Sequence, residues 1–375
     1  MKDYDPLFVF SDKTEKCGYF NKEFRIVIPP QFFVGDPFSE GLAAVHRESE
    51  SLWGYIDKKG EFVIPDEFVE CSPFCDGRSW VLRKYGGGWE IIDKTGRTVG
   101  PLRFRYPFRN FSEGLAVAKT EQQGKEGFVG RDGNWALPPE YERADSFAEG
   151  LAPVRVRGKW GFIDRNGEFR ISPLYDYARC FSDGLACVNI GGRPLSSFGY
   201  PKGGRWGFVD QTGKIIIEPC YSDFSDFHEG YAKVRVPVSE PKRDDVNPSP
   251  FRRFCRSVLA GLGLTDDSYR RRSLERYRYG YIDKTGRMAI GPEFCRAERF
   301  SEGLAAVSVY EDWDTSIMGY INRAGELTIP AKYETASEFR NGLAKVTSEK
   351  YNYIFYIDKT GKMVWPPYYN FYDNF

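Results

Sequence analysis

Residues 147–167 read FAEGLAPVRVRGKWGFIDRNG, and pieces of this stretch recur from one end of the chain to the other. A quartet of glycine, aromatic, aliphatic and aspartate begins at Gly54, Gly161, Gly207 and Gly280. Looser versions of the quartet begin at Gly18, Glu90, Gly127, Gly319 and Phe355. Self-similarity at a regular period indicates a repeat architecture, in which each unit completes its core against its neighbours.

Two further positions keep their distance from each of these nine starts. Fourteen residues on stands an aromatic, here named the fixed aromatic: Phe32, Phe68, Phe104, Tyr141, Tyr175, Tyr221, Phe294, Tyr333 and Tyr369. Twenty or twenty-one residues on stands a phenylalanine: Phe38, Phe74, Phe111, Phe147, Phe181, Phe227, Phe300, Phe339 and, at the chain end, Phe375. The sequence therefore predicts one array over residues 1–375, with units that start near residues 18, 54, 90, 127, 161, 207, 280, 319 and 355.

Each unit predicts three short antiparallel strands. The first carries the quartet, as at 53–57, whose alternating large side chains suit a pleated surface. The second follows at once, as at 61–65, and we expect proline to end it because proline has no N–H for a central ladder. The third reads Leu-Ala-x-Val, as at 151–154, and forms a hairpin with the next unit's first strand. The prediction is an all-β fold.

Acidic residues occupy two fixed positions. Aspartate opens a turn of the form Asp-x-x-Gly, as at 57–60, where it can accept backbone hydrogen bonds while glycine supplies a positive φ; cation binding is the alternative. A glycine stands before each third strand, and we expect it to adopt a backbone conformation that other residues avoid. A second acid directly precedes this glycine in most units: Glu40, Asp76, Glu113, Glu149, Asp183, Glu229 and Glu302. These acids either accept backbone hydrogen bonds at a tight corner or form a cation- or ligand-binding row. We favour the corner, because acids that do chemistry would not recur at equal spacing.

Composition narrows the class of protein. Lys and Arg together number 53, as do Asp and Glu, so no net charge draws the chain to nucleic acid or to a membrane. No segment approaches the ~20 apolar residues of a membrane span, and the N-terminus lacks an apolar run typical of a signal peptide. The eight cysteines share no phase of the repeat, and the pair Cys71 and Cys75 lacks a second pair for zinc. We expect reduced thiols, a cytoplasmic protein, and no metal or cofactor.

Insertions fall in a single loop type. From the glycine before the third strand to the next start, the gaps are 13, 13, 13, 11, 23, 50, 16 and 13 residues. All additions therefore lie in the hairpin between a third and a first strand. In a stacked array these hairpins emerge on one side, and insertions gathered on one side are typical of a binding face.

The largest insertion, 238–277, differs in composition from the array. Residues 251–262 place apolar side chains at i, i+3, i+4 and i+7, which predicts a helix with arginines opposite, and a second helical piece is expected over 266–276. The insertion is either a surface hairpin that covers the array or a docking element for an acidic partner or a phosphate. On the second interpretation the contact residues are Arg252, Arg253, Phe254, Arg256, Leu259, Arg270, Arg271 and Arg272.

With these motifs the chain resembles the WG repeat family, also called the KWG repeat, a β-repeat of largely bacterial proteins. The Trp-Gly pair stands at Trp53, Trp160 and Trp206, whereas Cys17, Glu126, Tyr279 and Met318 replace the tryptophan elsewhere, and Glu90 follows Trp89 in place of glycine. Membership implies a repeat fold and no particular activity. A looser similarity links the Trp-Gly-Tyr-Ile-Asp hairpin to choline-binding cell-wall repeats, whose aromatics enclose a quaternary ammonium.

We expect about nine three-stranded units in an open superhelix, with a small helical insertion. The alternative is a closed, propeller-like ring, because the chain begins with an apolar stretch at 7–10 and ends just before a third strand is due. Three strands per unit argue against that ring, since propeller blades usually carry four.

The sequence shows no constellation that breaks the repeat in the way an enzyme requires: His46 and His228 differ in phase, and there is neither a phosphate loop nor a nucleophile elbow. The leading hypothesis is a non-enzymatic scaffold that binds another protein through its loop-bearing face. The alternative is a small ligand or glycan held in aromatic clefts between repeats, which requires exposed aromatics aligned at one phase.

Overall fold

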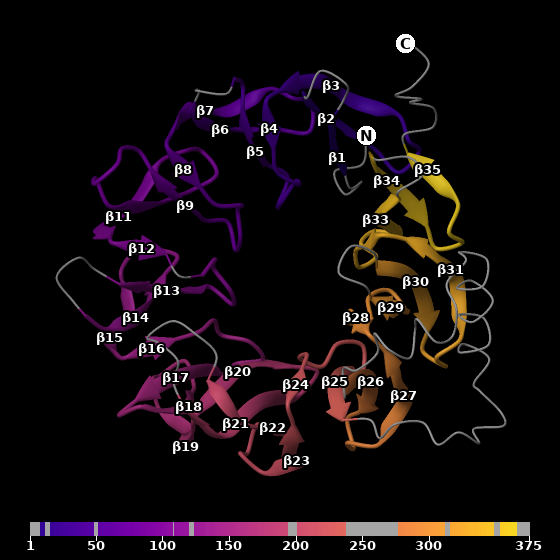
Figure 1. The fold of residues 1–375 in the computed structure, drawn as a ribbon. Helices are drawn as coiled ribbons and strands as arrows, with labels where there is room; N and C mark the ends of the chain where they lie inside the picture. Colours follow the sequence, from indigo (N-terminus) through magenta and orange to yellow (C-terminus); the bar gives the residue numbers. More distant parts are fainter. Residues whose placement is uncertain are drawn as a thin grey trace, which may run out of the picture. The chain divides into compact units, whose positions relative to one another are not determined.

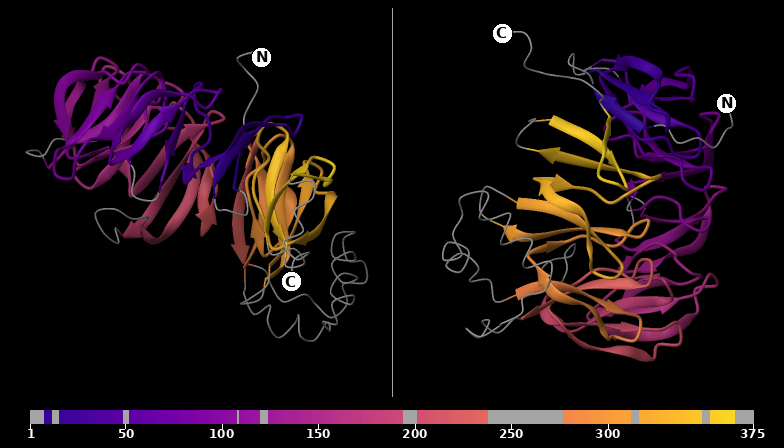
Figure 2. Two further views of the ribbon diagram at one scale, coloured as in Figure 1. Left: turned by 90° about the horizontal axis from the view of Figure 1, so that it is seen from above. Right: turned by 90° about the vertical axis from the view of Figure 1, so that its right-hand side faces the viewer.

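The computed structural model describes residues 8–11, 16–48, 52–107, 109–119, 124–193, 201–237, 277–311, 316–348 and 353–365. Throughout these residues the regular structure consists of β-strands paired antiparallel in small open sheets, and no described segment is helical (Figure 1 and Figure 2). The prediction of an all-β tandem repeat is confirmed. The choice between an open superhelix and a closed ring stays a prediction.

The chain divides into two compact units, the first formed by Met1–Phe181 with Gln211–Gly213 and the second by Ser182–Asp210 with Lys214–Phe375. The first unit contains a sheet of β1 (Phe8–Ser11), β2 (Cys17–Phe20) and β3 (Ile26–Phe32), and one of β4 (Val34–Gly35), β5 (Ala43–His46), β6 (Trp53–Ile56) and β7 (Phe62–Phe68). Its next sheet comprises β8 (Glu70–Cys71), β9 (Ser79–Leu82), β10 (Trp89–Ile92) and β11 (Thr98–Phe104). Two more follow: β12 (Tyr106–Pro107), β13 (Leu115–Lys119), β14 (Glu126–Gly130) and β15 (Trp135–Tyr141), then β16 (Arg143–Ala144), β17 (Ala152–Val156), β18 (Lys159–Ile163) and β19 (Phe169–Tyr175).

The remaining sheets have the same strand order. One comprises β20 (Tyr177–Ser182), β21 (Leu185–Arg193), β22 (Lys202–Val209) and β23 (Ile215–Tyr221), and another β24 (Asp223–Phe224), β25 (Tyr231–Pro237), β26 (Tyr277–Asp283) and β27 (Met288–Phe294). Then come β28 (Arg296–Ala297), β29 (Leu304–Glu311), β30 (Ser316–Asn322) and β31 (Leu327–Tyr333), and finally β32 (Thr335–Ala336), β33 (Leu343–Ser348), β34 (Tyr353–Asp358) and β35 (Met363–Trp365).

Most sheets contain a short first strand that the sequence pattern did not indicate. In the sheet β4–β7, the third strand of one predicted unit (β5) pairs with the first and second strands of the next (β6 and β7). The added strand β4 is two residues long and pairs with β5 through Val34 opposite His46. Two residues are too few to display the alternation by which a strand is recognised.

The expectation that proline ends the second strand is wrong. Strand β7 passes through Pro65 and continues to the fixed aromatic Phe68, which lies opposite Trp53. The register shifts between Trp53 and Tyr55, so the proline lies at a β-bulge. Because β7 is the edge strand of its sheet, a missing N–H there costs no ladder bond.

The glycine of the Trp-Gly pair is required by this bulge. A Cβ added at Gly161 would lie 2.5 Å from the Ile171 carbonyl oxygen and 2.7 Å from the Pro173 nitrogen, both backbone atoms of β19. Gly54 in β6 is crowded in the same way by the backbone of β7. The family's defining glycine therefore permits close approach of the last strand of each sheet.

The hydrophobic core lies between successive sheets of each unit. One cluster joins Tyr55, Ile64 and Phe68 of one sheet to Val81 and Ile92 of the next. Seven fixed aromatics are buried, namely Phe32, Phe68, Phe104, Tyr141, Tyr175, Phe294 and Tyr333. Tyr221 is only half-buried. At these seven positions the fixed aromatics therefore belong to the core.

The Asp-x-x-Gly turn has the predicted geometry. The Asp57 carboxylate accepts the N–H groups of Lys59 and Glu61 at 2.8 and 3.0 Å. Gly60 has a φ of 87° and donates its N–H to the Asp57 carbonyl at 3.0 Å. In another turn the Asn322 side-chain oxygen accepts the corresponding hydrogen bonds from the N–H groups of Ala324 and Glu326. These aspartates therefore hold turns, as the backbone interpretation predicts.

Candidate interaction surface

The acidic residues that precede the corner glycines connect neighbouring sheets. Each corner is a two-residue hairpin turn in which both central residues have positive φ, 53° at Glu229 and 86° at Gly230. His228 and Tyr231, on either side, exchange backbone hydrogen bonds. Nothing lies within 4 Å of a Cβ added at Gly230, so this glycine is favoured by its backbone conformation and not by lack of space.

The carboxylates of six of these acids accept a backbone N–H from the corner of the next sheet. The six contacts, each within one unit or the other, are Gly77 to Glu40 at 2.9 Å, Gly114 to Asp76 at 2.6 Å, Gly150 to Glu113 at 3.2 Å, Gly230 to Asp183 at 2.7 Å, Gly303 to Glu229 at 2.9 Å and Gly342 to Glu302 at 3.0 Å. A basic side chain from the next sheet's turn adds a charge-assisted contact, as Lys94 does to Glu40 at 3.1 Å. These acids thus accept backbone hydrogen bonds at the corners, as predicted, and the donor belongs to the following sheet.

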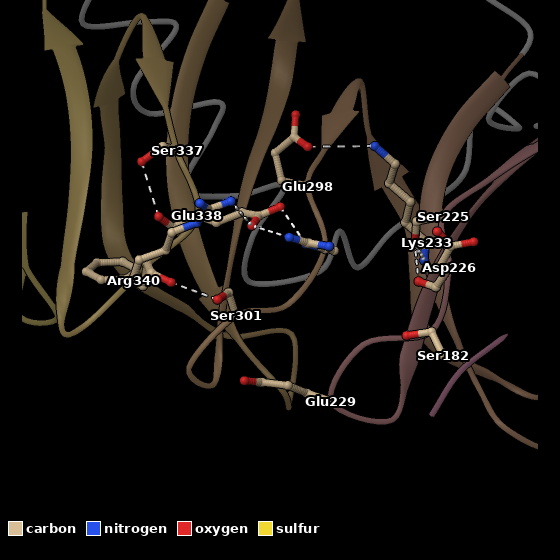
Figure 3. Close-up of polar contacts among 12 residues, drawn as sticks. Ser182, Ser225, Asp226, Glu229, Lys233, Glu298, Ser301, Ser337, Glu338 and Arg340 are labelled. Carbon is tan, nitrogen blue, oxygen red and sulfur yellow. Dashed lines mark hydrogen bonds and ion pairs between the residues drawn. The ribbon is translucent and has the colours of Figure 1, made fainter. Parts of the chain in front are cut away.

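Figure 3 shows the polar contacts that accompany these corners in the second unit. Lys233 donates to the Ala297 carbonyl at 2.6 Å and lies 3.9 Å from the Glu298 carboxylate. The Ser301 hydroxyl donates to the Phe339 carbonyl at 2.7 Å. Such serines recur, with Ser39 donating to Phe74 and Ser182 to Phe227. The carboxylates and hydroxyls along this seam are thus engaged by neighbouring sheets.

Other titratable groups include buried or partly buried thiols and a histidine. Burial raises the pKa of the Cys71 thiol to about 12, and burial lowers the pKa of His46 against the opposing effect of Asp36. The seven cysteines that the structure describes are free thiols. No group of three or more His, Cys, Asp or Glu suited to a metal ion occurs in the described ranges.

Two of the sequence repeats bury a glutamate at a position of the Trp-Gly pair. Glu126, in the tryptophan position, accepts the Ala144 N–H at 2.6 Å and pairs with Arg143 at 3.2 Å. Burial nevertheless raises its pKa, and Arg143 opposes that shift. Glu90, in the glycine position, contacts Thr98 at 2.7 Å and Arg103 at 3.3 Å. Both departures are visible in the sequence, but their compensating partners are not.

The hairpin loops that carry the insertions join the second and third strands of every four-stranded sheet. They therefore emerge at the corresponding end of each of these sheets. That they gather on one side of the array stays a prediction. The strands that lead to them are longer in the second unit: β5 and β6 have four residues each, whereas β21 has nine and β22 has eight. The paired strands of the β21–β22 hairpin are thus longer than those of β5 and β6.

The predicted contact residues of the large insertion lie outside the described residues. They are Arg252, Arg253, Phe254, Arg256, Leu259, Arg270, Arg271 and Arg272. Tyr277, the last residue of the predicted insertion, begins strand β26 and lies opposite Pro237. The helical character and the binding role of residues 238–276 stay predictions.

The strongly exposed aromatics of the described chain do not share a phase. They are Phe33 after a fixed aromatic, Tyr85 in a hairpin, Phe169 at the start of β19 and Tyr277 at the start of β26. Tyr277 lies under the Arg235 guanidinium, 4.7 Å from ring centre to Cζ. These residues form no aligned aromatic row along the described array.

Among the described residues, two of the open hollows are candidate binding surfaces. One, of about 560 Å³, lies between the sheets β1–β3 and β4–β7 and is lined by Lys16, Gln31 and Arg47 among others. Arg47 is paired there with Asp66 at 3.1 Å. The other, of about 600 Å³, lies on the extended β21–β22 hairpin and is lined by Ile190, Gly203, Arg205 and Ser222 among others.

The fold is that of a tandem β-sheet repeat protein. A family model described as "WG containing repeat" matches residues 18–46, 53–87, 127–160, 160–193, 206–236, 279–313 and 318–350, which together make up more than half of the chain. The chain belongs to this WG repeat family. No curated protein matches its sequence. None of the described segments forms a helix long and apolar enough to cross a membrane.

Several solved structures are similar to this chain at low TM-scores. The dihydro-heme d1 dehydrogenase NirN has a TM-score of 0.44 and 12% identity, over 88% of this chain and 74% of its own. AztD from Citrobacter koseri has a TM-score of 0.39 and 11% identity, over 96% and 93%. Virginiamycin B lyase from Staphylococcus aureus has a TM-score of 0.31 and 14% identity, over 62% and 92%.

Proposed function

We propose that this chain is a non-enzymatic scaffold that binds another protein through the loop-bearing ends of its sheets. The observation that carries the proposal is that every insertion falls in the hairpin between the second and third strands of a sheet. A scaffold that conserves its core and varies one set of loops is typical of recognition surfaces.

Two features support a protein partner over a stacked glycan or small ligand. The exposed aromatics differ in phase, whereas stacking would use a row of rings at one phase. The strands β21 and β22 extend a hairpin away from the common core, which adds irregular surface and exposes Ile190 by 43%. Exposed apolar side chains beside polar loops are typical of protein contacts.

The proposal assigns no catalytic role to the repeated acids. Glu40, Asp76 and Glu229 are each held by a backbone N–H and a basic side chain of the next sheet. A carboxylate occupied in this way serves the assembly of the array and is not placed to transfer a proton to a substrate.

Site-specific photo-crosslinking tests the proposal. A benzoylphenylalanine at Ile190, at the loop end of its sheet, should crosslink to a defined protein in cell extract. The same residue at Ile215, which is 37% exposed and lies at the opposite end of that sheet after the β22–β23 turn, is the matched control. Equal crosslinking at both positions, or crosslinking at Ile215 alone, would contradict binding through the loop end.

A further inference from the structure

The β21–β22 hairpin carries exposed basic side chains toward its loop end. Arg193 and Lys202 are cross-strand partners at its tip, and Arg205 lies further along β22; all three are exposed. Neither strand contains a carboxylate. Within the part of the chain that the structure describes, none of these three side chains makes a hydrogen bond or ion pair. The hairpin thus presents uncompensated positive charge.

In two places in the first unit the corresponding basic side chain is paired with an acid. Lys159 precedes the tryptophan of its sheet, as Arg205 does in β22, and it pairs at 2.6 Å with Asp176, the residue that follows the fixed aromatic. Arg155 of β17 pairs at 3.5 Å with Glu142, which follows the fixed aromatic of the preceding sheet.

Ser222 stands in place of both acids. It follows the fixed aromatic Tyr221 and therefore corresponds to Asp176 relative to Arg205. It also donates to the Arg235 carbonyl at 3.5 Å, in the position that Glu142 has beside Arg155. Ser222 thus places a neutral side chain where Glu142 and Asp176 place a carboxylate.

This arrangement forms one wall of the 600 Å³ hollow. Arg205 and the Ser222 hydroxyl line it together with Ile190 and the backbone of Gly203. A Cβ added at Gly203 would meet nothing within 4 Å, so the backbone there is open to a ligand. The hollow offers cationic donors, a hydroxyl and an apolar side chain within one small surface.

We propose that this basic hollow, lined by Arg205 and Ser222 beside the Arg193 and Lys202 pair, binds an acidic peptide segment of a partner protein. The inference rests on the proposed function and names the chemistry of its partner. A carboxylate of the peptide beside Arg205 would take the place that Asp176 has beside Lys159, and Ile190 would contact an apolar neighbour in the peptide. Three unpaired cations on a chain of zero net charge are too few for the multiple phosphate contacts of nucleic-acid binding.

Fluorescence anisotropy with the full chain tests this assignment. The probes are a fluorescein-labelled peptide of alternating Glu and Leu, its Gln–Leu counterpart and a labelled oligothymidylate. The Glu peptide should bind more tightly than the Gln peptide, and its affinity should fall as salt rises. Ser222→Asp, which recreates the Lys159–Asp176 arrangement, should weaken binding about fivefold, the size of one exposed charge pair. Arg205→Glu should weaken it at least as much.

Lys159→Glu is the matched control, because it alters the equivalent position of the first unit and should leave peptide binding unchanged. Each variant changes an exposed side chain, and an unaltered melting temperature verifies folding. Equal affinity for the Glu and Gln peptides, unchanged binding by Ser222→Asp, or tighter binding of oligothymidylate would each overturn the assignment. Crosslinking at Ile190 with no effect of Ser222→Asp would leave the proposed function standing and reject the acidic peptide. If no protein crosslinks at Ile190 but the Glu peptide still binds, the proposed function is rejected and the acidic-peptide site stands.

Discussion

The Glu229 carboxylate accepts the backbone N–H of Gly303 at 2.9 Å, although the two residues are 74 positions apart in the chain. It also accepts the Glu302 N–H at 2.6 Å and pairs with Arg323 at 2.9 Å. One side chain therefore holds both the corner and the turn of the next sheet. The cost is a positive φ at a residue with a side chain, a conformation that is uncommon outside glycine.

Removing this contact should destabilise the second unit. Glu229→Ala leaves the two corner N–H groups without their charged acceptor, and we expect a loss of ~1–3 kcal/mol in the free energy of unfolding at neutral pH. Urea denaturation measures it. Arg340→Ala, an exposed substitution in the same unit whose only ion pair is a long 3.8 Å contact, should change little and is the control. An equal loss in both variants would contradict the role of Glu229.

The stability that Glu229 contributes should depend on pH. Burial acts to raise its pKa, but the hydrogen bonds from Arg323, Gly303 and Glu302 outweigh it and lower the pKa below 4.5. A carboxyl group with a lowered folded-state pKa contributes stability above its ordinary pKa and loses it as pH falls through the folded-state value. The difference between the wild type and Glu229→Gln should therefore shrink below about pH 4. A difference that stays constant with pH would argue against this linkage.

The fixed aromatics should differ in energetic weight according to burial. Tyr175 is buried, so Tyr175→Ala should cost ~3–5 kcal/mol, as large-to-small changes in cores do. Tyr221 is half-buried, and Tyr221→Ala should cost clearly less. Chemical denaturation of both variants gives the comparison. Unchanged stability of Tyr175→Ala with loss of partner binding would instead identify a contact residue.

The signature glycine should tolerate no side chain. In Gly161→Ala the new Cβ meets backbone oxygen at 2.5 Å, and neither strand can yield without losing its ladder, so we expect a loss of about 3 kcal/mol. Gly291→Ala is the control, because nothing lies within 4 Å of its added Cβ. Thermal melts of the two variants should separate widely; similar melting temperatures would exclude close approach as the reason for the glycine.

The turn aspartates should be replaceable by asparagine and not by alanine. Asp57→Ala removes the acceptor of two backbone N–H groups and should cost about 1 kcal/mol. Asp57→Asn should be close to neutral, because Asn322 already forms the same two hydrogen bonds in another sheet. A cation-dependent melting temperature that Asp57→Asn abolishes would favour the cation-binding alternative.

The large insertion should be dispensable for folding and needed for recognition. Replacing residues 237–276 by a short glycine-containing turn should change the melting temperature little, because loop-closure entropy rises slowly with length. The same variant should lose partners that the intact protein captures from native lysate. A much lower melting temperature or aggregation would show that the insertion covers an apolar patch, and full retention of partners would reject its role in recognition.

The sequence by itself determined the repeat, the all-β class, the turn chemistry at residues such as Asp57 and Gly60, and the buried positions of Tyr175 and its equivalents. These features are local. A turn is specified by four residues, and a core position is specified by its constant distance from the start of the repeat. Every repeat therefore shows the same signal in the sequence.

Only the tertiary structure decided which groups meet across the sheets. Val34 becomes a strand because β5 lies beside it, and Pro65 continues an edge strand because nothing pairs with its outer side. The Glu229 carboxylate accepts the Gly303 N–H, and Lys159 forms an ion pair with Asp176. At the corresponding place Arg205 and Ser222 line one hollow. Such partners are separated by many residues, and the unit's period does not indicate which neighbour supplies the donor. Only packing of successive sheets brings these partners together, and it also leaves the charges of the β21–β22 hairpin uncompensated.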